Sequence, residues 1–192
     1  MTMMRKTTCV VWLCVLGLLV VQANAAFQSS SCFYDNHPQS IVKTLAGDSD
    51  LSTFAAMLNA SGLNEVIDES YYTVFAPTNH AFEQFYYDFG LASDDLMANK
   101  DILISGVEFH IHSGIFNYAN FTSGEELSTL LSDETLSVNK VSDNSVNITA
   151  DESWASIIRG NVWACNGVVH IIDYVLVPES ALEQYEDGVD RK

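Results

Sequence analysis

The chain has 192 residues, a length typical of one ordinary domain with short extensions, which argues against a multidomain machine. Aspartate and glutamate number 25 against 8 lysine and arginine residues, so the net charge is −17. Binding to nucleic acids or to anionic membrane surfaces needs clustered cations, and we therefore expect neither. Hydrophobic residues make up 48% of the chain and charged residues 17%, a composition typical of a globular protein.

The N-terminal segment has the pattern of a secretory signal. Two positive charges lie in Met1–Lys6, residues 10–21 are almost all apolar, and Ala23-Asn24-Ala25 provides small residues for a signal peptidase. The apolar run is shorter than the roughly 20 residues that span a bilayer as a helix. We predict a signal peptide over residues 1–25 and a secreted, extracellular protein without stable membrane insertion.

Four cysteines are present, and two of them, Cys9 and Cys14, lie within the predicted signal. Cys32 and Cys165 remain as a pair, and an oxidising compartment favours a single disulfide between them. Two separately buried thiols are the alternative, because a sequence does not show how far apart two cysteines lie.

Three tripeptides match the acceptor pattern for N-linked glycans: Asn59-Ala60-Ser61, Asn120-Phe121-Thr122 and Asn147-Ile148-Thr149. Their presence behind a signal sequence predicts glycosylation at these three asparagines in a eukaryotic secretory pathway.

The first half of the chain after the signal is rich in helix patterns. Leu51, Phe54 and Leu58 recur at helical spacing after a capping segment and before Gly62. Aromatic and branched residues indicate a strand that ends at Pro77. The predicted helices cover residues 51–62, 78–90 and 93–104, and the predicted strand covers residues 71–75.

Short strands dominate the second half. The turn dipeptide Asn166-Gly167 precedes a long branched segment that Pro178 ends. The predicted strands cover residues 107–112, 115–118, 136–141, 146–150 and 168–177, with a short helix or turn at residues 125–131. Because helices come early and strands late, we expect an α+β fold with largely antiparallel pairing.

Two long segments carry a resemblance to a known family. Residues 72–82 (YTVFAPTNHAF) and residues 166–178 (NGVVHIIDYVLVP) resemble the two signatures of the fasciclin (FAS1) domain. Residues 108–114 resemble the central tyrosine-histidine segment of that family, with Phe109 in place of the usual tyrosine. The resemblance implies a FAS1-like wedge of two antiparallel β-sheets with helices packed around them. We assign residues 26–37 to an N-terminal arm, 38–179 to the FAS1-like domain and 180–192 to an acidic tail.

The same resemblance implies a function. Fasciclin domains are mostly extracellular modules of adhesion and matrix, and most are not enzymes. We therefore expect a non-catalytic module without a cofactor, which binds an extracellular protein or glycan such as a cell-surface receptor or a matrix component.

Two segments of the resemblance suggest binding residues. In some animal members the tyrosine-histidine segment and an aspartate-isoleucine pair are implicated in integrin binding, and they correspond here to Phe109-His110 and Asn161-Val162. Phe109 lacks the hydroxyl and Asn161 lacks the carboxylate, and no Arg-Gly-Asp tripeptide replaces them. Trp154 and Trp163, near the second signature, are either core or contact residues.

The histidines suggest an alternative function. On the predicted strand 107–112, His110 and His112 would face the same side and provide two metal ligands, with His80 or His170 as a third. The alternative is therefore a secreted small-ligand-binding or metal-binding protein, or an enzyme, that uses the His110/His112/His170 group.

We favour a structural role for His110 and His170. A buried imidazole needs hydrogen-bond partners, and polar neighbours such as Thr78 or Asn79 would supply them. The sequence contains no nucleophile elbow and no glycine-rich phosphate loop, so we predict no catalytic residue and no metal site.

Overall fold

The computed structural model describes residues 39–150 and 153–181. The predicted signal peptide, the N-terminal arm with Cys32 and most of the acidic tail lie outside these residues. The helices are α1 (Ile41–Ala46), η1 (Ser49–Leu51), α2 (Ser52–Ser61), α3 (Asn64–Asp68), α4 (Asn79–Phe89), α5 (Ser93–Ala98), α6 (Lys100–Phe109) and η2 (Tyr118–Asn120). The strands are β1 (Tyr72–Pro77), β2 (Ile111–Ser113), β3 (Glu126–Ser128), β4 (Thr135–Ser142), β5 (Ser145–Thr149), β6 (Trp154–Ala164) and β7 (Gly167–Ile172).

Helices α2 and α4 form where the sequence predicts them, and α4 carries a capping signal at each end. The Thr78 side chain accepts a hydrogen bond from the Ala81 amide at the start of α4, and Gly90 ends that helix in the left-handed conformation (φ 62°). Gly62 ends α2 in the same way, with φ 82°.

The predicted third helix is in fact two helices. Asn99 separates α5 from α6, and its side chain accepts hydrogen bonds from the Asp101 and Ile102 amides to cap α6. Helix α6 continues to Phe109, so the prediction of a strand over residues 107–112 is wrong for its first four residues. Leu103 and Val107, four positions apart, are both buried on α6, and this helical spacing explains the result.

The strands pair in the order β2-β1-β7-β6-β5-β4-β3. All neighbours are antiparallel except β1 and β7, which are parallel from Tyr72↔Gly167 to Pro77↔Ile172. Strand β6 joins two layers, because its first residues pair with β5 and the rest pair with β7. This arrangement confirms the α+β class, and the parallel pair is a feature that the sequence did not predict.

Three local predictions in the second half need correction. Residues 115–118 form no strand but lead into η2, and the short helix or turn predicted over residues 125–131 contains strand β3. The last strand ends at Ile172 and not at Val177, because the chain leaves the sheet to run along the helices.

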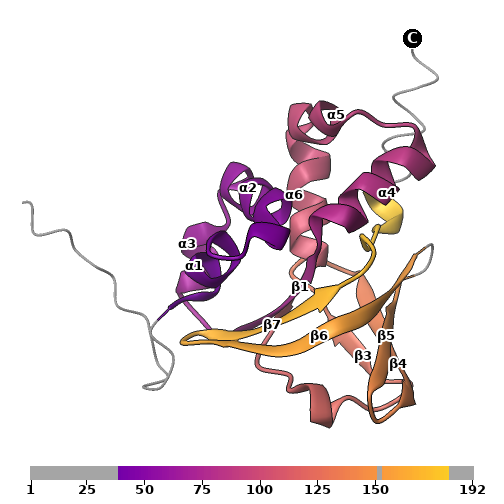
Figure 1. Ribbon diagram of the computed structural model, residues 1–192. Helices are drawn as coiled ribbons and strands as arrows, with labels where there is room; N and C mark the ends of the chain where they lie inside the picture. Colours follow the sequence, from indigo (N-terminus) through magenta and orange to yellow (C-terminus); the bar gives the residue numbers. More distant parts are fainter. Residues whose placement is uncertain (1–38, 151–152, 182–192) are drawn as a thin grey trace, which may run out of the picture. The chain divides into compact units, whose positions relative to one another are not determined.

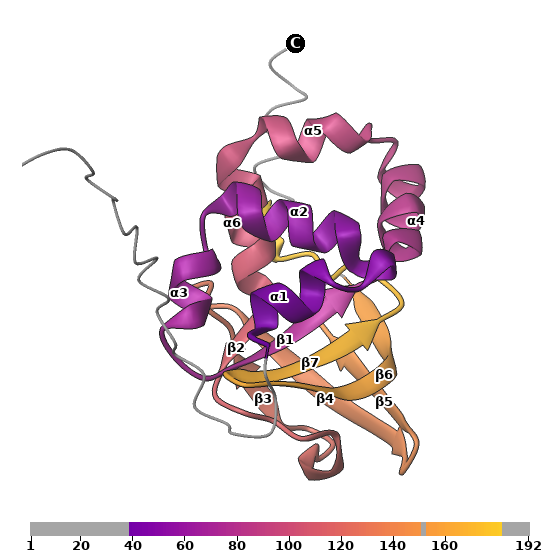
Figure 2. The same cartoon turned by 60° about the vertical axis from the view of Figure 1, so that its left-hand side comes forward.

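Two clusters of buried side chains hold the layers together. The helices pack against one face of β1 and β7, as Figures 1 and 2 show, and this core includes Phe54, Phe82 and Val169. The second core lies on the strand-rich side and includes Phe75 from β1 and Ile148 from β5. Strand β1 contributes to both, since Val74 lies in the first core and Phe75 in the second.

The β6–β7 turn is fixed by a buried side chain. Ala164 pairs with Gly167, so the turn residues are Cys165 and Asn166. The Asn166 side chain is buried, and its Oδ1 accepts from the Ile41 amide at 2.8 Å while its Nδ2 donates to the Ile67 carbonyl at 2.9 Å. One asparagine thereby ties helices α1 and α3 to the sheet.

Replacing Asn166 by alanine is expected to lower the free energy of unfolding by about 3 kcal/mol, because the buried Ile41 amide and Ile67 carbonyl lose their partner. Urea unfolding measures this loss. Asn144→Ala is the matched control in the exposed turn between β4 and β5. Equal stability of the two variants would contradict the role of Asn166.

Candidate functional site

His110 follows the last turn of α6, and its side chain is only 2% exposed. Its Nδ1 donates to the Gly106 carbonyl at 2.7 Å, and its Nε2 accepts from the Leu176 amide at 3.1 Å. Burial lowers the pKa of His110 to about 4, although the hydrogen bond to Gly106 acts in the opposite direction. The ring is therefore neutral at physiological pH, and both of its nitrogens are occupied by the backbone.

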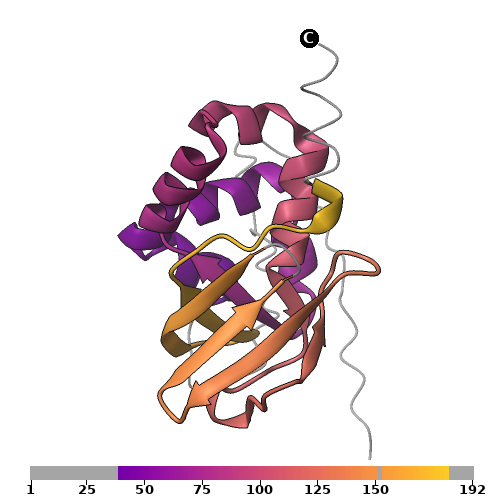
Figure 3. The same ribbon diagram turned by 90° about the vertical axis from the view of Figure 1, so that its right-hand side faces the viewer.

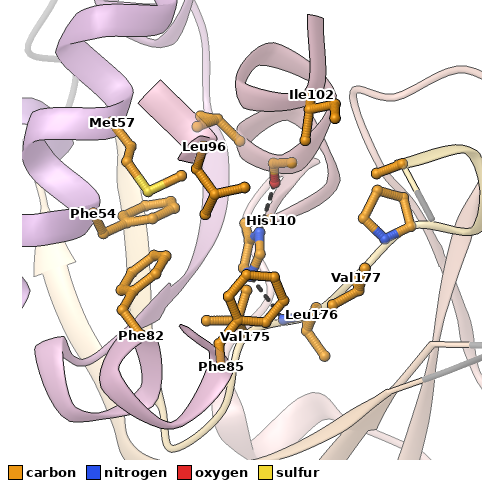
Figure 4. A pocket seen from close by; sticks show the side chains of 14 residues that line it. Phe54, Met57, Phe82, Phe85, Leu96, Ile102, His110, Val175, Leu176 and Val177 are labelled. Atoms are coloured by element: carbon orange, nitrogen blue, oxygen red, sulfur yellow. Dashed lines mark hydrogen bonds between the residues drawn. The ribbon is translucent and has the colours of Figure 1, made fainter. Parts of the chain in front are cut away.

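An apolar pocket lies beside His110, between helices α2, α4 and α6 and the segment after β7 (Figure 4). It contains about 450 Å³ of space between atoms, part of it open to solvent. The lining side chains are almost all aliphatic or aromatic, with Phe54 and Phe82 on one side and Val177 on the other. His110 is the one titratable side chain among them.

His170 lies on β7 and is fully buried. Its Nε2 donates to the Phe116 carbonyl at 2.8 Å, and its Nδ1 accepts from the Asn161 amide at 3.3 Å. The ring stacks on Phe75 with 5.7 Å between centroids. Burial lowers the pKa of His170 to about 4, despite the hydrogen bond to Phe116.

Asn161 and Val162 lie in β6 at an irregularity of its pairing with β7. Asn161 adopts a left-handed conformation (φ 58°), which asparagine tolerates better than most residues. Its Oδ1 accepts from the Tyr118 amide at 2.9 Å, and its Nδ2 donates to Asn117 Oδ1 at 3.1 Å. Asn161 therefore positions the loop before η2, and the half-buried Val162 packs against the helix-side core.

The two predicted binding pairs, Phe109-His110 and Asn161-Val162, differ in how far their side chains are exposed. Phe109 and His110 are both 2% exposed, so their side chains present almost no area to a partner. Asn161 and Val162 are partly exposed, and Asn161 is hydrogen-bonded to His170 and not to His110. Binding through these four residues stays a prediction. Because Phe109 and His110 are buried, a partner at this pair would have to contact the residues that surround them.

The structural role predicted for His110 and His170 is correct in kind, but the predicted partners are wrong. Thr78 caps α4, and Asn79 accepts from the Thr53 amide at 2.9 Å. Both histidines instead use backbone groups, which a sequence pattern does not reveal.

The predicted histidine group for a metal does not form. His110 ends a helix and His112 lies in β2, where its Nδ1 donates to the Ser128 carbonyl at 2.6 Å. His80 is exposed beside Glu83, at 3.4 Å. Within residues 39–150 and 153–181, no three His, Cys, Asp or Glu side chains are grouped so that they could hold a metal ion.

The modification sites remain predictions, and the structure shows their surroundings. Asn59 and Asn120 are exposed, and Asn147 is half-buried on β5. Cys165 is buried in the β6–β7 turn. Its predicted partner Cys32 lies outside the described residues.

A surface that the sequence analysis did not identify lies on the strand-rich side, where β4, β5 and β6 run side by side (Figure 3). Exposed and buried residues alternate along these strands. We call the outward side chains the outer sheet face: Ser137, Asn139, Asn147, Thr149, Trp154, Ser156 and Ile158. The alternation of polar and apolar residues in residues 135–149 was the signal that could have revealed it.

The outer sheet face combines small polar groups with two large apolar ones. Ser137, Thr149 and Trp154 form one cross-strand row. Asn139, Asn147 and Ser156 form the next, in which the Ser156 hydroxyl donates to Asn147 Oδ1 at 3.1 Å. Trp154 is 60% exposed and Ile158 is 58% exposed. An exposed tryptophan beside hydroxyl and amide groups is well suited to contact a protein or a sugar.

No helix among the described residues is long and apolar enough to cross a membrane.

Comparison with known proteins identifies relatives of the chain. The sequence profile of the Fasciclin domain matches residues 49–178. Protein sll1483 of Synechocystis is 37% identical over 72% of this chain and 73% of its own length. Transforming growth factor-beta-induced protein ig-h3 of Sus scrofa is 30% identical over 72% of this chain, which spans only 19% of that protein. Human periostin is 28% identical over 73% of this chain and 16% of its own length.

A solved structure has the same fold. A FAS1 domain pair from the insect cell adhesion molecule fasciclin I superposes with a TM-score of 0.65, at 18% identity, over 76% of this chain and 53% of that chain. The profile match covers both signature segments, which contain strands β1 and β7. The chain therefore belongs to the fasciclin domain family.

Proposed function

We propose that this protein is a secreted extracellular fasciclin module that mediates cell adhesion or matrix interaction by binding a protein or glycan, without catalysis. Its family membership and its likeness to ig-h3 and periostin support this function in general terms. The outer sheet face is the observation that supports the proposal most specifically, because it provides particular side chains that would contact a partner. An exposed tryptophan beside polar side chains is a common energetic anchor of an interface.

The strong negative charge of the protein favours a partner that is not itself a polyanion. The net charge is −17, and Lys140 is the one cationic residue within β4 and β5, where it pairs with Asp143 at 3.5 Å. Neutral sugars and proteins with a basic surface are compatible with this charge, whereas sulfated glycans are repelled.

Replacing Trp154 by alanine is expected to weaken attachment by about 30-fold in the half-saturating concentration, the effect of an anchor worth about 2 kcal/mol. The full chain is expressed in eukaryotic cells, and the secreted protein is immobilised and offered to cells, matrix proteins and neutral glycans. Chelator is added in a parallel series to detect a divalent-dependent receptor.

Tyr87→Ala provides the matched control, because Tyr87 is an aromatic residue on α4 that is 87% exposed. Asn147→Gln is also tested, since a glycan at Asn147 would cover part of the outer sheet face, and we expect it to keep or raise attachment. Equal attachment of the tryptophan and tyrosine variants would contradict the assignment of the binding surface.

A further inference from the structure

Asn166 and Gly167 form the one Asn-Gly dipeptide of the chain. Asparagine deamidates most readily before glycine, because a following backbone nitrogen that is not shielded by a side chain reaches the asparagine side chain most easily. Asn144-Ser145, in the exposed turn between β4 and β5, is less reactive because serine carries a Cβ atom. Residue types alone therefore make Asn166 the asparagine of this chain that deamidates first.

Deamidation proceeds through a succinimide ring. The Gly167 nitrogen forms a bond to the side-chain carbonyl carbon of Asn166, and the bond from that carbon to Nδ2 breaks. Nδ2 leaves as ammonia together with the proton of the Gly167 amide. Water then opens the ring at either of its carbonyl carbons, which gives aspartate or isoaspartate at position 166. Ring formation requires the Asn166 side chain to rotate toward the following peptide bond.

The folded protein holds Asn166 in a position that prevents this rotation. The residue is 1% exposed, and the bonds to the Ile41 amide at 2.8 Å and the Ile67 carbonyl at 2.9 Å fix both ends of its side-chain amide. Its own carbonyl oxygen accepts from the Tyr72 amide at 3.2 Å. Gly167 is confined as well, because a Cβ atom there would lie 1.9 Å from the Tyr72 carbonyl oxygen. The ring forms only when α1, α3 and β1 separate from the turn.

The products no longer fit the folded structure. An aspartate at position 166 has no Nδ2 to donate to the Ile67 carbonyl, and its buried carboxylate would face that oxygen and the Asp68 carboxylate, which now lies 3.4 Å from Asn166 Nδ2. Isoaspartate adds a carbon atom to the main chain directly before Gly167, where the pairing with Tyr72 begins. Both products therefore oppose refolding.

We propose that Asn166 is a modification site that becomes reactive only when the chain unfolds, and that its deamidation makes unfolding permanent. In the folded protein the rate follows the small fraction of molecules in which the turn has opened. The dipeptide thereby limits how long a molecule can stay unfolded and still recover. This property is independent of the outer sheet face and of the partner that binds there.

The test follows Asn166 and Asn144 in the secreted full chain at mildly alkaline pH, once folded and once in guanidinium chloride, by peptide mass spectrometry. We expect Asn166 to react at least about 100-fold more slowly in the folded protein than in the unfolded chain. Asn144 is exposed and should change far less, so the order of the two sites reverses on unfolding. If Asn166 reacts as fast in the folded protein as in the unfolded chain, the proposed protection is wrong.

Refolding measures the consequence of the modification. Protein kept unfolded for increasing times is diluted into buffer, and near-ultraviolet circular dichroism gives the fraction that refolds. We expect this fraction to fall with the same time course as intact Asn166. Asn144→Gln, which removes the control reaction, should lose its ability to refold at the wild-type rate. Chains with aspartate or isoaspartate at position 166 that refold like fresh protein would overturn the proposal.

Discussion

Lowering the pH from 6.5 to 4 is expected to remove about 3 kcal/mol from the free energy of unfolding for each of the two buried histidines. Burial lowers the pKa of His110 and of His170 to about 4 from the ordinary value of 6.5. In this window the unfolded chain binds a proton at each histidine while the folded chain does not. The stability is fully present above pH 6.5 and is lost as the pH falls to about 4.

Glu108, two residues before His110 in the chain, acts in the opposite direction. Burial raises the pKa of Glu108, so its protonation stabilises the folded chain at low pH and opposes the histidine effect. The combined loss of about 6 kcal/mol is comparable with the whole stability of a typical domain, about 5 to 15 kcal/mol. We therefore expect the protein to unfold, or nearly so, before the pH reaches 4.

Urea unfolding between pH 7 and 4 measures this dependence. His110→Phe removes one titrating ring and is expected to halve the slope of stability against pH, at the cost of lower stability at pH 7. His80→Ala, at an exposed position, is the control and should keep the full slope. A free energy of unfolding that stays constant from pH 6.5 to 4 would show that the two rings are not buried as neutral groups.

Gly167→Ala is expected to prevent folding, with a loss of more than about 4 kcal/mol, because the new methyl group overlaps the backbone. A Cβ atom at Gly167 would lie 1.9 Å from the Tyr72 carbonyl oxygen and 2.8 Å from Ile41 Cδ1. Tyr72 is the residue that Gly167 faces in the parallel β1–β7 pair. Relief of the overlap requires the two strands to separate, which breaks the parallel β1–β7 pairing.

The yield of secreted protein and its urea midpoint measure this effect. Gly124→Ala is the matched control, since Gly124 has φ 83° but no atom within 4 Å of the added Cβ. Gly124→Ala is expected to lower the free energy of unfolding by only about 1 kcal/mol, because alanine is unfavourable in this left-handed conformation. Similar losses in the two variants would mean that Gly167 is needed for its backbone conformation and not for the close approach of β1.

Local signals explain which elements the sequence predicts well. Thr78 and Gly90 mark both ends of α4, and the alternation along β4 and β5 defines their hairpin. The region around Phe109 was mispredicted because Val107, Phe109 and Ile111 are apolar at a spacing of two, which fits a strand as well as the end of a helix. The parallel pairing of β1 with β7 depends on contacts between segments far apart in the chain, which no local pattern encodes.

The candidate site also combines features that local sequence signals indicate with features that only long-range packing determines. The sequence suggests His110 and His170 as interior residues, but their partners are backbone groups, of which the Leu176 amide and the Phe116 carbonyl lie 66 and 54 residues away in sequence. Asn161, chosen by resemblance as a binding residue, has a structural role in holding the loop before η2. The alternation along residues 135–149 indicates the outer sheet face, but the pairing of β6 with β5, which brings Trp154 to this face, could not be deduced from residue types alone.

The most direct test of the outer sheet face compares the attachment of folded Trp154→Ala and Tyr87→Ala proteins to cells, matrix proteins and neutral glycans. We predict that the tryptophan variant loses attachment while the tyrosine variant keeps it. Undiminished attachment of a folded Trp154→Ala protein would contradict the proposal that this face mediates adhesion.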